Sequence, residues 1–188
     1  MSNTKFILKL AAILFAIVFV CSLLLALCNN LTEGRIQKLR IKEENEARVQ
    51  VLSDAKEFKK VNASADVLEA YVGTDADGNT VGFCFKVAPS GFGGKITMMV
   101  GVDTDCKVTG VKITDMAETP GLGAKASEEE WISQFKSKAD EISVVKTGNA
   151  KDSEINAISG ATITSKAVAN GVNIALKQAK ALTAKEGE

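Results

Sequence analysis

The hydrophobic residues near the start of the chain form one uninterrupted apolar run. From Leu10 to Cys28 there are 19 residues without a charge, and Ser22 is the only polar one among them. As a helix this run would be roughly 28 Å long, enough to cross the hydrocarbon core of a membrane. A cleaved signal peptide is the competing interpretation, but the run is long for one and no Ala-x-Ala-like site follows it. Residues 1–30 are therefore predicted to be an uncleaved transmembrane anchor.

The pattern changes directly after the apolar run. From Leu31 to Val61, apolar residues recur at helical spacing between charges of alternating sign, which is typical of a solvated surface helix. The apolar positions are Ile36, Leu39, Ala47, Val51, Leu52, Ala55 and Phe58. Residues 31–61 are therefore predicted to be a stalk helix, with a plain linker as the alternative.

The rest of the chain, residues 62–188, has the pattern of a folded domain. Runs rich in β-forming residues, separated by turn residues, predict four strands. These runs cover residues 66–72, 80–87, 95–102 and 107–113. The segment Asp75–Asn79 between the first two is predicted to be a hairpin turn, because the later glutamate that a calcium loop needs is missing at the required spacing.

Two helices and one further strand complete the predicted domain. Ser127, with Glu130 three residues later, has the spacing of a capping box at the start of a short helix. Trp131 and Phe135 lie one turn apart on that helix, so they are predicted to be core residues, with ligand contact as the alternative. The remaining elements are a strand over 141–146 and a helix with apolar residues from Val168 to Ala179. The predicted fold class is α+β: a membrane helix and a stalk helix, then a mostly antiparallel sheet with packed helices.

Composition excludes several classes of function. Lys+Arg and Asp+Glu each number 23, so no excess of positive charge indicates a nucleic-acid partner. Histidine is absent, which excludes Ser-His-Asp and Cys-His catalysis and His-ligated metals. Cys84 and Cys106, the thiols outside the anchor, match no zinc or redox spacing, and a disulfide between them stays open. A chain without histidine that still does chemistry is expected to rely on a cofactor.

A cluster of small hydroxyl residues lies at the predicted start of the last helix. Its sequence is Ser159-Gly160-Ala161-Thr162-Ile163-Thr164-Ser165. The N-terminus of a helix offers unpaired N–H groups and the positive end of the helix dipole, which together favour a phosphate. Gly160 would let the backbone approach a bulky group. From composition alone, an ordinary N-cap cluster is the alternative interpretation.

A second segment, Glu118-Thr119-Pro120-Gly121-Leu122-Gly123, has the composition of a rigid turn. Proline fixes one backbone dihedral, and the two glycines open others. Upstream, residues 91–94 (Gly-Phe-Gly-Gly) form a flexible stretch that could approach a ligand, although no helix follows it as in a phosphate loop.

Taken together, the two segments resemble the FMN-binding domain family. Ser-Gly-Ala-Thr followed by Ile-Thr-Ser is similar to the flavinylation motif of that family, in which the closing threonine carries FMN through a phosphoester bond. The matching residue in this chain is Thr162. The segment 118–123 resembles the family's loop against the flavin, which implies that Leu122 contacts the ring and that Glu118 and Thr119 hydrogen-bond its polar atoms. The cofactor-binding residues that the resemblance implies are Thr162, Ser159, Gly160, Ala161, Thr164, Glu118, Thr119, Gly121 and Leu122.

One position departs from the pattern of the family. The family commonly has an aspartate three residues before the Ser/Thr of the flavinylation motif, and this chain has Asn156 there. The change removes a charge that a modifying flavin transferase would recognise. It bears on the efficiency of flavinylation and leaves the site unchanged.

The family includes the G subunit of the Rnf ferredoxin:NAD oxidoreductase complex and the C subunit of the sodium-pumping NADH:quinone oxidoreductase. The resemblance implies electron transfer by covalent FMN within such an ion-translocating membrane complex, with the length of the chain favouring the first. It also implies other complex subunits as partners, including a second flavin-carrying membrane subunit, and a flavin transferase for maturation; no independent catalytic site is expected. An anchored flavoprotein that acts alone is an alternative, and an anchored binding or scaffold module without flavin is an alternative of another class.

The side of the membrane is predicted differently by charge and by resemblance. Lys5 and Lys9 precede the apolar run, while Arg35, Lys38, Arg40 and Lys42 follow it. The basic residues therefore favour a C-terminal domain on the inner side. The resemblance implies a single-pass protein of the cell membrane with its soluble domain on the extracytoplasmic side, and this is the prediction we adopt.

Overall fold

The computed structural model describes residues 2–146 and 148–186, which form two compact units, Met1–Lys42 and Glu43–Glu188. Helix α1 (Ser2–Val51) forms the first unit and begins the second. An 18-residue window within it has a mean hydropathy of 3.0 and is wholly unburied. By length and composition α1 can therefore cross a membrane, which agrees with the predicted anchor.

The stalk helix is shorter than predicted. α1 ends at Val51, and residues 57–61 form strand β1 (Glu57–Val61) instead of the last turns of a helix. The carbonyl oxygen of Val51, the last residue of the helix, accepts a hydrogen bond from the hydroxyl of Thr109. The prediction of a helix through Val61 is wrong beyond Val51, because antiparallel pairing with the next strand overrides the helical spacing of residues 52–61.

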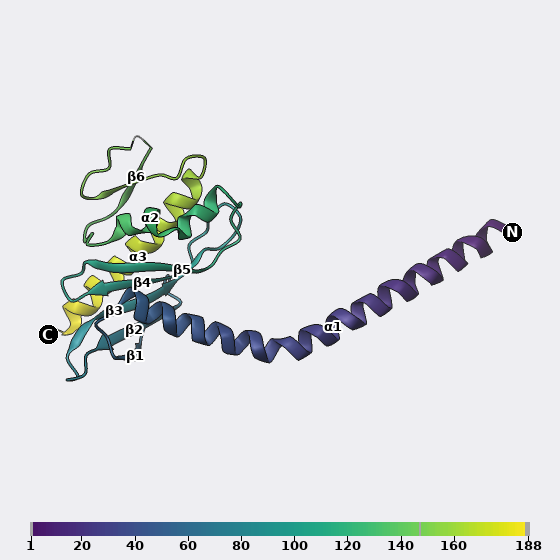
Figure 1. The fold of residues 1–188 in the computed structure, drawn as a ribbon, viewed down its shortest axis with the longest axis horizontal. Helices are drawn as coiled ribbons and strands as arrows, with labels where there is room; N and C mark the ends of the chain where they lie inside the picture. Colours follow the sequence, from purple (N-terminus) through teal and green to yellow (C-terminus); the bar gives the residue numbers. More distant parts are fainter. Residues whose placement is uncertain (1, 147, 187–188) are drawn as a thin grey trace. The chain divides into compact units, whose positions relative to one another are not determined.

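Five antiparallel strands lie side by side in the order in which they occur in the sequence (Figure 1). After β1 come β2 (Glu69–Thr74), β3 (Thr80–Val87), β4 (Thr97–Asp103) and β5 (Val108–Asp115). The last four confirm the predicted strands. Asp75–Asn79 is the predicted hairpin turn: an Asp75 carboxylate oxygen accepts hydrogen bonds from the N–H groups of Asp77 and Asn79. In the part of the chain that the structure describes, no cluster of acidic or sulfur ligands could hold a metal ion.

Both faces of this sheet are covered, by different helices. In β3 and β4 alternate residues, such as Phe83, Phe85 and Val100, belong to the core with helix α3 (Thr162–Glu186). The residues between them, such as Cys84 and Met99, pack against the end of α1. β3 and β4 therefore each place one set of side chains beneath α3, the helix that begins at Thr162.

A glycine lets the end of α1 lie close to the sheet. A Cβ atom at Gly101 would come within 2.2 Å of the carbonyl oxygen of Val51. The same face carries Tyr71, whose ring centroid lies 4.2 Å from the guanidinium carbon of Arg48 and whose hydroxyl bonds to Glu69. Burial, together with that bond to Glu69, raises the pKa of Tyr71 to about 12.

The connection from β5 to α3 contains short elements that the sequence predicted only in part. They are η1 (Gly123–Ser127), α2 (Glu129–Ile132), η2 (Ser133–Phe135), β6 (Ser143–Val145) and β7 (Glu154–Asn156). β6 lies within the predicted strand 141–146, but it pairs in parallel with β7, a strand that was not predicted. This separate two-stranded sheet leads the chain into the start of α3.

The predicted capping box at Ser127 is wrong. Ser127 ends η1, and its hydroxyl donates to the carbonyl oxygen of Ala124. The N-cap of α2 is Glu128, without a side-chain capping bond. Of the two aromatic residues on this segment, Phe135 is fully buried, as predicted for core. Trp131 is half-buried and meets the Phe135 ring edge-on at 5.4 Å.

Both thiols outside α1 are free, so the open question of a disulfide is answered in this structure. Cys84 is buried in the sheet, and burial raises the pKa of its thiol to about 12. Cys106 is half-buried in the turn between β4 and β5, with a positive φ of 59°. Neither residue lies in the hydroxyl cluster or the turn that the sequence singled out.

Candidate functional site

A tight turn delivers Thr162 as the first residue of α3. The N–H of Ala161 donates to the carbonyl oxygen of Ile158 at 2.9 Å, and Gly160 takes a φ of +77° within the turn. The first hydrogen bond of the helix runs from the N–H of Ser165 to the carbonyl oxygen of Ala161 at 3.0 Å. Thr162 therefore stands in the first turn of a 25-residue helix, where N–H groups have no partner in the helix itself.

The hydroxyl residues of this turn are not equivalent. Ser165 is fully buried; its hydroxyl donates to the Ala161 carbonyl at 2.9 Å and accepts from the N–H of Ile158 at 3.0 Å. Thr164 is also buried, at 1% exposure. Ser159 is exposed and Thr162 is half-buried. Of the four hydroxyl residues in this cluster, Ser159 and Thr162 are therefore the two that are not buried.

The segment that resembles the flavin-contacting loop lies against this turn. Thr119, Pro120 and Gly121 are exposed, and Gly121 has a φ of +77°. Leu122 is 45% exposed, and a Cβ atom at Gly160 would lie 3.2 Å from its Cδ2 atom. The structure therefore brings together the two segments that the sequence analysis selected, about forty residues apart in the chain.

Glu118 is the one acidic residue of this loop, and its carboxylate is turned inward. Its side chain is 8% exposed. One oxygen, Oε1, accepts from the N–H groups of Phe92 and Gly93 at 2.8 and 3.0 Å. The other, Oε2, accepts from the hydroxyl of Thr164 at 2.7 Å. Thus Glu118 and Thr164, both predicted as flavin contacts, bond to each other inside the protein.

Three large apolar side chains remain exposed on the segments that meet here. Phe92 is 69% exposed, Ile163 56% and Leu122 45%. They come from the glycine-rich stretch 91–94, from the first turn of α3 and from the loop 118–123, respectively. Phe92 was not singled out by the sequence analysis; an aromatic residue inside a glycine-rich stretch was the signal available.

A cavity of about 320 Å³ adjoins the turn on the side of Ser159. Trp131 and Asn156 line it, and they are tied together because the indole N–H donates to the Asn156 carbonyl oxygen at 2.8 Å. The N–H of Asn156 donates to the side-chain oxygen of Gln134 at 2.8 Å. Among the described residues, the buried Oδ1 atom of Asn156 has no hydrogen-bond partner. The residue that departs from the family pattern therefore holds an acceptor beside the candidate site.

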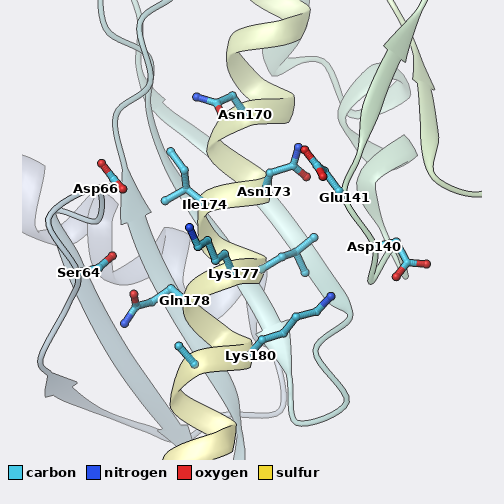
Figure 2. A pocket seen from close by; sticks show the side chains of 12 residues that line it. Ser64, Asp66, Asp140, Glu141, Asn170, Asn173, Ile174, Lys177, Gln178 and Lys180 are labelled. Atoms are coloured by element: carbon cyan, nitrogen blue, oxygen red, sulfur yellow. The ribbon is translucent and has the colours of Figure 1, made fainter.

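A larger cavity, of about 720 Å³, runs along α3 farther from Thr162 (Figure 2). Its charged lining residues are Asp66, Asp140, Glu141, Lys177 and Lys180. Asn170, the first residue of α3 to line it, follows Thr162 by eight positions, roughly 12 Å along a helix axis. Among the described residues, its lining includes none of the predicted site residues. The larger of these two cavities is therefore not the one beside the candidate site.

Comparison with known proteins supports the resemblance. A family profile described as an FMN-binding domain matches residues 91–177, the stretch that holds both segments of the candidate site. Two crystal structures share the fold. The C subunit of the Na(+)-translocating NADH-quinone reductase from Parabacteroides distasonis gives a TM-score of 0.57 at 23% identity, covering 76% of this chain and 91% of that one. NqrC from Shewanella oneidensis gives 0.50 at 19% identity, covering 66% of each chain, just under two thirds.

Curated relatives match over nearly the whole chain. The G subunit of the Na(+)-translocating ferredoxin:NAD(+) oxidoreductase complex of Acetobacterium woodii is 40% identical, over 92% of this chain and 91% of its own. The G subunit of the proton-translocating complex of Clostridium ljungdahlii is 36% identical, over 88% and 87%. The G subunit of an ion-translocating oxidoreductase complex of Methanosarcina acetivorans is 32% identical, over 94% and 96%. The chain therefore belongs to the FMN-binding domain family, in the group formed by the G subunits of these oxidoreductase complexes.

Proposed function

We propose that this protein is an electron-transfer subunit of a membrane-bound, ion-translocating ferredoxin:NAD oxidoreductase complex, and that it carries FMN covalently on Thr162 through a phosphoester bond. The likeness to G subunits supports the complex, because three of them match at 32–40% identity over most of the chain. The other subunits, among them a second flavin-carrying membrane subunit, are its proposed partners. A flavin transferase is proposed to attach the cofactor.

The position of Thr162 is the observation that carries the covalent attachment. The residue is reachable and stands at the N-terminus of α3, whereas the hydroxyls of Thr164 and Ser165 are buried and already bonded within the protein. A helix N-terminus stabilises a phosphate through its unpaired N–H groups and its dipole. A phosphoester on the Oγ1 atom of Thr162 would place the phosphate at that end of the helix.

The surroundings of Thr162 also fit the rest of FMN. Exposed apolar side chains at Leu122, Ile163 and Phe92 offer surface for the aromatic ring system. Asn156 lines the cavity beside Ser159, and its buried Oδ1 atom is an acceptor that has no partner among the described residues. Gly121, Gly160 and Ala161 keep side-chain bulk away from the turn. These residues, with Ser159 and Thr119 at the exposed edge, remain the proposed contacts.

In turnover the protein itself needs neither a nucleophile nor a base. Bound FMN supplies the capacity to accept and donate electrons one or two at a time. The chain contributes the position of the cofactor, apolar cover by Leu122 and a phosphate anchor at α3. Apolar cover disfavours added charge on the ring relative to water, so these residues would set the redox potential.

Peptide mass mapping of the protein purified from its native membrane tests the attachment. We expect one FMN, less one water, on the peptide that contains Thr162. Thr162→Ala should abolish covalent flavin and leave the fold intact, while Ser159→Ala, which removes the other reachable hydroxyl, should keep it. Flavin on Ser159 or Thr164 would overturn the proposed attachment.

We also propose that the protein crosses the cell membrane once and that its folded domain lies on the extracytoplasmic side. The span is supported by α1 and by the membrane complexes of the relatives; the side rests on the resemblance, against the basic residues that follow the span. Protease added to intact cells should cleave beyond Thr32. Protection of the domain until the membrane is opened would place it on the inner side.

Two alternatives within the same chemistry are the C subunit of a sodium-pumping NADH:quinone oxidoreductase, whose fold is shared, and an anchored flavoprotein that acts alone. The genes beside this one discriminate between them, since a complex is encoded with its other subunits. A binding or scaffold module is the alternative of another class. Absence of flavin absorbance after expression with a flavin transferase would favour that module over the proposed function.

A further inference from the structure

Glu118 joins three segments that are distant in the sequence. Its Oε1 atom accepts two backbone hydrogen bonds from the stretch 91–94, and its Oε2 atom accepts one from Thr164 in the first turn of α3. Glu118 itself begins the loop that ends at Gly123. Each of these three segments carries one of the residues proposed to surround the flavin: Phe92, Thr162 and Leu122.

The space around this carboxylate is closed by glycines. A Cβ atom at Gly91 would lie 2.3 Å from Oε1, and a Cβ atom at Gly123 would lie 2.6 Å from Oε2 and 2.8 Å from the hydroxyl oxygen of Thr164. Any side chain at either position would therefore push the carboxylate out of place. The two glycines are explained by the fit of the carboxylate, a role distinct from turn formation.

The hydrogen bonds of Glu118 suit a buried anion. Its three partners are neutral donors at 2.7–3.0 Å, and a charged acceptor makes such bonds roughly twice as strong as neutral ones. Removing the carboxylate would leave buried donors without an acceptor, which costs more than the net gain from a single bond. The three segments are therefore joined through a buried carboxylate whose two oxygens both accept hydrogen bonds within the protein.

We infer that Glu118 is a positioning residue of the FMN site: by bonding to the stretch 91–94 and to Thr164 it holds Phe92, Leu122 and the first turn of α3 in register, and it acts on the flavin through them. This inference rests on the proposed function, because it assigns Glu118 a role at the FMN site. It replaces the direct hydrogen bond from Glu118 to the flavin that the sequence resemblance implies.

Amide hydrogen exchange tests the connection itself, with or without flavin on the chain. In the full-length protein in detergent, the N–H groups of Phe92 and Gly93 should be protected. Glu118→Ala should lower their protection about tenfold or more, the factor that corresponds to one lost hydrogen bond to a charged group. Glu118→Gln should retain most of it, because the amide oxygen still accepts from both N–H groups. Glu69→Gln is the matched control, since it alters a bonded carboxylate on β2 outside the site.

The flavin readout tests the positioning role. In the flavinylated protein, Glu118→Ala should keep covalent FMN on Thr162, shift the midpoint potential and lower the fluorescence anisotropy of the flavin. Glu118→Gln should return both signals toward those of the wild type. Thr164→Val removes the hydroxyl that bonds Oε2 and keeps the shape, so it should shift the same two signals in the same direction; Thr164→Ser should not.

The outcomes separate this inference from the proposed function. Wild-type protein without flavin overturns the function and the positioning role together, while exchange at Phe92 and Gly93 still reports the connection. Flavinylated Glu118→Ala with exchange accelerated but potential and anisotropy unchanged overturns the positioning role alone. Unchanged exchange also overturns it. If Glu118→Ala does not fold, Thr164→Val decides, because it removes only one of the three bonds.

Discussion

Replacing Ser165 with alanine tests whether the turn before Thr162 is fixed by the helix that follows it. The hydroxyl of Ser165 donates to the carbonyl oxygen of Ala161 and accepts from the N–H of Ile158, so it closes both ends of that turn. The side chain is fully buried. Alanine keeps the Cβ atom and is a better helix former than serine, so any loss of stability comes from the missing oxygen.

The loss has two parts. The hydroxyl loses its own bond to Ala161, a net contribution of about 1 kcal/mol for a neutral hydrogen bond. The N–H of Ile158 then stays buried without an acceptor, which costs about 1–3 kcal/mol. Because the two effects share one oxygen and are not additive, we expect a decrease of about 2–3 kcal/mol in the free energy of unfolding. For a unit of this size that corresponds to a decrease in Tm of about 4–12 °C.

Urea denaturation of the unit 43–188, followed by circular dichroism, measures this change. Ser127→Ala is the matched control, because its hydroxyl makes a bond of the same length to the Ala124 carbonyl but is exposed; its effect should stay within about 0.5 kcal/mol. The slope of the transition should be unchanged in both variants. If Ser165→Ala is as stable as the control, Ile158 finds another acceptor, and the turn that presents Thr162 is not held as described.

Three further outcomes are expected. A fragment that begins at residue 43 should fold, whereas one that begins at residue 56 should unfold at a lower urea concentration. The shorter fragment lacks the end of α1, which covers the face of the sheet that carries Tyr71 and Cys84. Equal urea midpoints for the two fragments would contradict this. Tyr71 is the single tyrosine, and its ultraviolet absorbance should show ionisation near pH 12. Because the pKa in the folded state lies above the unfolded value, the contribution of Tyr71 to stability is complete below about pH 10 and is lost toward pH 12. Ionisation near pH 10 would disprove the burial argument. Leu122→Ala should keep covalent flavin but shift its midpoint potential, and an unchanged potential and spectrum would mean that Leu122 does not cover the ring.

The strands and the long apolar helix were predictable because each leaves a strong local signal in the sequence. Residues 80–87 and 95–102 are rich in β-forming residues and bounded by turn residues, and both became strands of the main sheet. The end of α1 left no such signal. No glycine or proline stands near Val51, and the charges of residues 56–61 suit either a helix or an edge strand. The pairing of β1 with β2 decides between them, and it depends on residues farther along the chain.

The candidate site was predictable as a pair of segments and not as a set of contacts. The motifs at 118–123 and 159–165 pointed to residues that the fold brings together. The inward turn of Glu118 could not be foreseen, because its partners lie 26 residues upstream, at Phe92, and 46 residues downstream, at Thr164. Hydrogen bonds at such separations depend on the packing of α3 on the sheet, which no local pattern encodes.

The sequential order of the five strands has a consequence for how the protein is made. Each strand pairs with the one synthesised just before it, so the sheet can assemble by closing short loops as the chain emerges. The helix that covers its apolar face comes much later: Leu176 follows the end of β5 by some 60 residues, roughly 3–12 s of translation. During that interval Phe83, Phe85 and Val100 have no cover beside a membrane to which the chain is already anchored. A chain that ends before α3 would therefore leave the apolar face of the sheet uncovered, and Thr162 is made only after all five strands.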